Sequence, residues 1–98
     1  MPFESLTQAA LFRLLPPGTP LDLIRNLTGR NLGRRTVLRH DRRHKDIVMT
    51  IPNGEEARFS YKFPFLLSFD PETSTLSAYH ADDTSAPLLT YKLFSKEL

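Results

Sequence analysis

The sequence predicts one α+β domain over residues 1–98, in which two N-terminal helices precede a five- or six-stranded antiparallel meander. Two observations predict this class. Apolar residues recur at helical spacing up to about residue 28, and from Arg35 onward they alternate with polar residues, as in a half-buried strand. Such a meander is strongly twisted and can curl toward a small barrel, with the helices covering one face or one end.

The first helix is predicted from its end signals and its apolar spacing. Ser5 followed by Gln8 fits a capping box, and the run Pro16-Pro17-Gly18 cannot continue a helix. Between these signals the apolar residues recur at helical spacing: Leu6, Ala9, Ala10 and Leu14.

A second, short helix is predicted to run from Pro20 to about residue 28. Thr19 suits the N-cap, Pro20 suits the first helical position, and Gly29 suits a left-handed stop. The apolar stripe of this helix consists of Leu21, Ile24 and Leu27.

The strands are predicted from alternation, from β-branched residues and from the turn residues between them. The turn Pro52-Asn53-Gly54 favours a three-residue hairpin loop, because that loop length places the apolar residues of both strands on one face. Ile47 then faces Phe59, and Met49 faces Ala57. The predicted strands are residues 35–40, 46–51, 57–63, 65–69, 74–80 and 86–94.

An aromatic stripe follows this hairpin. Phe59, Tyr61 and Phe63 share one side of their strand and could stack unpaired bases, but a small sheet needs the same stripe for its core, which is the favoured interpretation. Pro64 cannot donate to a strand ladder, so a bend, a bulge or an edge is expected there.

Positive charge is concentrated in residues 25–45. This segment holds eight of the thirteen Lys and Arg residues and one carboxylate, Asp41, whereas residues 46–98 hold four basic and eight acidic residues. The formal net charge of +2 therefore understates the field on one side of the molecule. Seven of the eight basic residues are arginine, whose planar fork suits bidentate contact with phosphate or carboxylate.

These residues predict a small, non-enzymatic binding or regulatory protein with an anionic partner. Nucleic acid, RNA or DNA, is the favoured partner, although the sequence holds no helix-turn-helix, zinc-finger or common RNA-binding motif. The predicted anion-binding residues are Arg30, Arg34, Arg35, Arg39, Arg42, Arg43 and Lys45.

Three other interpretations remain open. The same charge could dock an acidic protein surface, as in an interaction module, an inhibitor or an accessory subunit. It could also be a solvated face or pair internally with nearby carboxylates. Finally, His40 and His44 beside arginines could act as acid and base in a small ribonuclease-like enzyme.

Composition bounds the remaining possibilities. The chain has no cysteine, which excludes disulfides, thiol nucleophiles and zinc sites of the cysteine type. His40 and His44 straddle a strand end and a turn among basic residues, so we expect neither a metal nor a cofactor there. No basic leader precedes an apolar run, and we expect a soluble cytoplasmic protein that does not contact a membrane.

Overall fold

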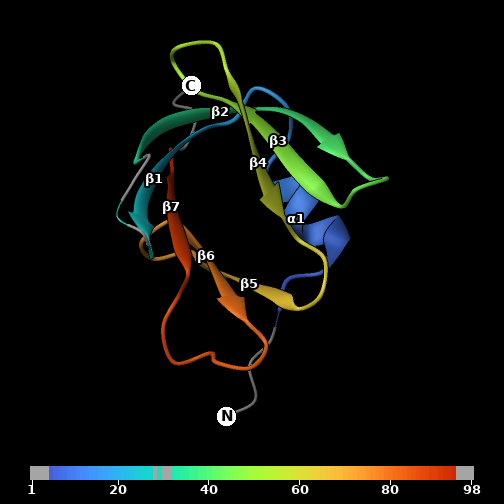
Figure 1. Ribbon diagram of the computed structural model, residues 1–98, viewed down its shortest axis with the longest axis vertical. Helices are drawn as coiled ribbons and strands as arrows, with labels where there is room; N and C mark the ends of the chain where they lie inside the picture. The colour runs from blue at the N-terminus through green and yellow to red at the C-terminus, as the bar shows by residue number, and fades with distance from the viewer. Residues whose placement is uncertain (1–4, 28, 30–31, 95–98) are drawn as a thin grey trace.

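The protein is a curled antiparallel sheet with a short helix beside it (Figure 1). A computed structural model describes residues 5–27, 29 and 32–94. Within these residues the elements are α1 (Gln8–Leu14), β1 (Pro20–Asn26), β2 (Gly33–Asp41), β3 (Asp46–Thr50), β4 (Glu56–Ser60), β5 (Phe65–Asp70), β6 (Thr75–His80) and β7 (Leu89–Leu93).

The predicted pair of N-terminal helices is wrong, because the second segment is the strand β1. Leu21 and Leu23 point into the core and Asp22 lies between them, which is the alternation of a strand. β1 pairs with β2 on one side and with β7 on the other. Seven residues form a marginal helix on their own, so two ladders of hydrogen bonds outweigh the helical spacing.

The predicted α+β class and the single meander of five or six strands are also wrong, because the described residues form one short helix and seven strands. The strand order is β4-β3-β2-β1-β7-β6-β5, so β1–β4 and β5–β7 are two meanders joined through the β1–β7 pair. β4 and β5 follow each other in the chain but form the two edges of the sheet. The bend predicted at Pro64 lies in the segment between them.

The predicted register of the β3–β4 hairpin is confirmed. Ile47 faces Phe59, and Met49 faces Ala57. The Gly54 N–H donates to the Ile51 carbonyl (2.9 Å), and Gly54 has a φ of 91°, which an L-residue rarely adopts. Turn chemistry and alternation therefore agreed with the final pairing.

The core lies inside the curl of the sheet. Phe59 on the edge strand β4 packs edge-on against Tyr91 on β7, with ring centroids 5.3 Å apart. β4 and β7 are separated by three strands in the sheet order, so this contact crosses the interior. The other buried residues of this core come from the α1 segment and from β1, β2, β3, β5, β6 and β7, and they are Leu11, Leu15, Leu21, Leu23, Val37, Ile47, Met49, Leu67, Leu76, Ala78 and Leu93.

The segment that contains α1 joins the two edges of the sheet. The Leu6 N–H donates to the Leu67 carbonyl of β5 (2.8 Å), and the Phe12 ring packs edge-on against Tyr61, just after β4. The helix is capped by Thr7, whose Oγ1 accepts from the Ala10 N–H (3.1 Å), and not by a Ser5 capping box. No helix in the described part of the chain has the length and apolarity needed to cross a membrane.

Candidate functional site

The predicted anion-binding residues are spread along β2 and the turn that follows it. Arg30 lies outside the described residues. Arg34 is near the start of β2 and Arg42 just after its end, so their backbones are roughly 26 Å apart along the strand at about 3.3 Å per residue. The two ends of the predicted site must therefore be considered separately.

At the start of β2, Arg34 and Arg35 both have partners within the protein. Arg34 Nε donates to Asp22 Oδ1 (2.9 Å), and the Arg34 guanidinium lies 4.6 Å from the centroid of the Phe94 ring. Arg35 is 6% exposed and donates to the Gly33 carbonyl. Burial raises the pKa of Tyr91 to about 12, and the charge of Arg35 acts on this pKa in the opposite direction. Arg35 is therefore an interior cation, and Arg34 is partly neutralised.

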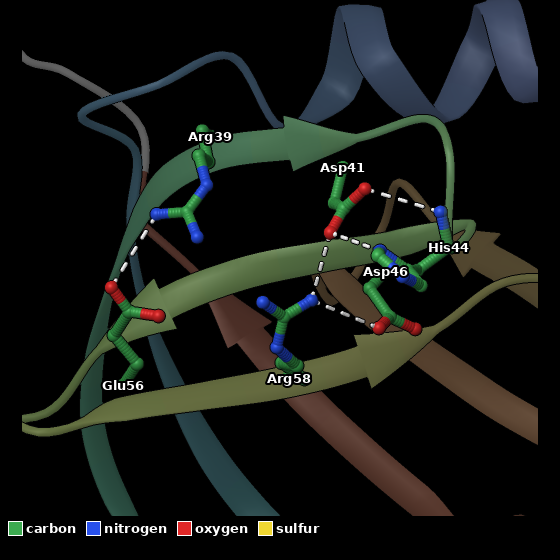
Figure 2. Close-up of polar contacts among 6 residues, drawn as sticks. All are labelled: Arg39, Asp41, His44, Asp46, Glu56 and Arg58. Carbon is green, nitrogen blue, oxygen red and sulfur yellow. Dashed lines mark hydrogen bonds and ion pairs between the residues drawn. The ribbon is translucent and has the colours of Figure 1, made fainter.

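Near the end of β2, Arg39 belongs to a row of charges on the outer face (Figure 2). Arg39 donates to Glu56 Oε2 (3.4 Å), and Arg58 on β4 donates to Asp41 (2.9 Å) and Asp46 (3.2 Å). Val48 lies between Arg39 and Arg58 in the sheet register and is fully buried, although it faces away from the interior core. The aliphatic stems of these arginines thus shield an apolar residue on the outer face.

Asp41 at the end of β2 organises the turn. Besides Arg58, it accepts from His44 Nδ1 (2.8 Å) and from the His44 backbone N–H (3.1 Å) (Figure 2). The donated hydrogen bonds, first from Arg58 and then from His44, hold the pKa of the Asp41 carboxyl well below its ordinary value of 3.8. Asp41 is therefore ionised and fixes the shape of the turn.

The Asp41→Asn variant is expected to be less stable at neutral pH and to have a flatter acid dependence. Because the folded-state pKa is depressed, the ionised carboxyl stabilises the fold above 3.8, and this contribution is lost as the pH falls below that value. Urea midpoints measured from neutral pH down to about pH 3 should therefore decline more steeply for the wild type than for Asp41→Asn. Glu72→Gln, in the exposed β5–β6 turn, is the control and should keep the wild-type decline. Parallel declines for wild type and Asp41→Asn would contradict the prediction.

The two histidines of the predicted ribonuclease-like pair do different things. His40 stacks on Phe12, with centroids 4.1 Å apart, and its Nε2 lies 2.6 Å from the Leu15 carbonyl oxygen. A carbonyl only accepts, so Nε2 carries the proton and the ring ties the end of α1 to β2. His44 is exposed and bonded at Nδ1 to Asp41. Each ring is therefore held by a different partner, His40 by Leu15 and His44 by Asp41.

The remaining cations lie in the turn between β2 and β3. Arg42, Arg43 and Lys45 are exposed, and within residues 5–27, 29 and 32–94 no carboxylate is within ion-pair distance of them. Arg42 extends over the Phe12 ring, 5.2 Å from its centroid. We name Arg42, Arg43 and Lys45 the basic turn. It is the part of the predicted site whose charge is not compensated by a described carboxylate.

A cleft of about 430 Å³ opens beside the basic turn. Lys45 lines it, and so do Lys62 and Phe63 from the segment after β4. The sequence did not predict Lys62 as part of a site, and it gave base stacking by Phe63 only as an alternative to the favoured place in the core. Pro64 was the available signal, since a strand that ends before a proline no longer alternates its side chains between two faces.

Comparisons with known proteins assign no family to this arrangement. The chain matches no protein-family model, no curated protein and no solved structure. The functional argument therefore depends on the contacts, the charges and the exposure of the described residues.

Proposed function

We propose that this chain is a small non-enzymatic nucleic-acid-binding protein and that the basic turn is its main phosphate contact. The observation that carries the proposal is the difference between the arginines of β2 and the basic turn that follows the strand. Arg34 and Arg39 have carboxylate partners and Arg35 is interior, whereas the basic turn is exposed and has no described carboxylate partner. Only cations that are not already paired gain fully from releasing the counterions of a nucleic acid.

The neighbouring groups support phosphate as the ligand. The Asp41 carboxylate pairs with Arg58 and His44. It therefore fixes the conformation of the turn and does not neutralise the three cations of the basic turn. Two of the three cations are arginines, which bind phosphate oxygens in a bidentate manner. His40 is held by Leu15 and Phe12, which supports a binding role over an acid–base role.

The test is the salt dependence of binding to labelled mixed-sequence RNA and DNA strands, measured by fluorescence anisotropy. The wild type is expected to lose affinity steeply with salt. The triple variant Arg42→Gln, Arg43→Gln, Lys45→Gln should bind weakly, with a log–log salt slope shallower by about 2 if all three residues contact phosphate, at about 0.7 per contact on a single strand.

A matched triple variant removes the same charge from β1 and β2. Arg25→Gln, Arg34→Gln, Arg39→Gln lowers the net charge equally, and its salt slope should stay close to that of the wild type. A larger loss in this variant would move the contact surface to β1 and β2. Absence of binding by the wild type at low salt would overturn the nucleic-acid proposal.

A protein partner is the second candidate, because apolar side chains are exposed near the β1–β2 end. Ile24, Leu27 and Leu32 are each more than half exposed, and Arg25 lies among them. Exposed apolar side chains beside a charge are typical of protein interfaces. This surface becomes the leading candidate if no nucleic acid binds at low salt.

A further inference from the structure

The cleft beside the basic turn combines an exposed aromatic ring with two lysines. Phe63 is 78% exposed, the largest value among the exposed large apolar residues of the described chain. Lys45 belongs both to the basic turn and to the cleft, and Lys62 directly precedes Phe63. Apolar residues of the α1 segment and β5 also line the cleft, and they are Leu6, Leu11 and Leu67.

The exposure of Phe63 follows from the end of β4. The strand stops at Ser60, and the Phe65 N–H then donates to the Lys62 carbonyl (3.0 Å), which closes a tight turn around Phe63 and Pro64. The alternation that buries Phe59 no longer applies at Phe63. The chain therefore presents this ring to solvent at the mouth of the cleft, next to two cations.

These features fit one chemical class of ligand better than others. A nucleobase is a flat aromatic group that stacks on phenylalanine, and its phosphates would meet lysine and arginine side chains. The cleft volume of about 430 Å³ is within the range of ligand sites, roughly 300–1,000 Å³. Bases of a duplex are already stacked on one another, so only an unpaired base is free to enter.

We propose that the cleft receives an unpaired base of a single-stranded nucleic acid, stacked on Phe63, while the basic turn and Lys62 contact the flanking phosphates. This inference rests on the proposed function and adds to it the class of nucleic acid and the base-contacting residue. It predicts a preference for strands that have bases over strands with the same phosphates and no bases.

The experiment compares three probes: an oligothymidylate of about a dozen nucleotides, an abasic strand of equal length, and a blunt duplex of equal length. The wild type should bind the oligothymidylate roughly five- to hundredfold more tightly than the abasic strand, the range expected for stacking of one base. Phe63→Ala should bind the oligothymidylate no better than the abasic strand. Its affinity for the abasic strand should stay at the wild-type value.

Two further variants separate stacking from folding effects. Phe63→Trp should keep the affinity for oligothymidylate, and because the chain has no tryptophan of its own, quenching of the new fluorescence reports stacking directly. Leu27→Ala removes an exposed apolar side chain elsewhere and should leave all affinities unchanged. A melting temperature close to that of the wild type shows that each variant is folded.

The outcomes distinguish the inference from the proposed function. If the wild type and Phe63→Ala bind oligothymidylate and abasic strands equally, with a steep salt dependence, then the phosphate contact stands and stacking on Phe63 is wrong. A preference for the duplex, or Phe63→Trp fluorescence that bound oligothymidylate does not change, also overturns the inference. If no probe binds at low salt, the proposed function itself fails.

Discussion

Replacing Leu23 with alanine is expected to lower the free energy of unfolding by about 2–5 kcal/mol, whereas the same change at the adjacent Ile24 should cost about 1 kcal/mol or less. Leu23 is 4% exposed on the central strand β1, and Ile24 is 51% exposed. Ile24 follows Leu23 and therefore points to the opposite, outer face, and it is the extra residue of a bulge in the β1–β7 pairing. Chemical denaturation followed by circular dichroism measures both values, with linear extrapolation to water.

This pair of variants tests the correction from helix to strand. A helix over the same segment would bury the stripe Leu21, Ile24 and Leu27, and Leu23 would lie beside that stripe. The expected order of the two effects is then reversed. A larger loss at Ile24 than at Leu23 would contradict the strand, provided that the dependence on denaturant stays equal in both variants.

Local information sufficed for the hairpin between β3 and β4. The turn residues at positions 52–54 select a loop length, and the alternation of apolar residues in the flanking strands selects the same register. Both signals lie within about fifteen residues of one another and select the same register. Tertiary contacts therefore did not change the pairing that the local sequence predicts.

The segment from Pro20 to Asn26 lacked such agreement. Its apolar residues fit a helical stripe and also fit a strand with one bulge, and its partner β7 lies at the far end of the chain. The pairing of β1 with β7 joins residues far apart in the chain, so the residues around β1 carry no signal of it. The order of strands was mispredicted for the same reason, because β7 joins β1 and leaves β4 and β5 as edges.

The candidate site was only partly readable from the run of charge. Successive side chains of a strand point to opposite faces, so Arg34 lies outside and Arg35 inside. The bulge at Leu38 then shifts the alternation before Arg39. The carboxylates that pair with Arg34 and Arg39 come from β1 and β4, and neither pairing is visible in the segment itself. The sequence thus located the positive charge, but it did not show which cations are paired with carboxylates in the fold.

Phe59→Ala is expected to lower the free energy of unfolding by about 3–5 kcal/mol, and Phe63→Ala by less than about 1 kcal/mol. The Phe59 side chain is 3% exposed and crosses the interior to Tyr91, so its removal leaves a cavity at the contact between the edge strand β4 and β7. Phe63 is mostly exposed beside the cleft. The two variants remove the same side chain from the predicted aromatic stripe, which makes each the control for the other.

The contrast between these phenylalanines also connects stability with binding. If both were core residues, as the alternation alone predicts, both variants would be strongly destabilised and Phe63 would not be available to a ligand. If Phe59→Ala cost no more than Phe63→Ala, the contact of β4 with β7 across the interior would contribute little to the stability of the fold. A large loss for Phe59→Ala with a small one for Phe63→Ala means that the Phe59 ring helps to anchor the hairpin, and that Phe63 can change without weakening the fold that holds the basic turn in place.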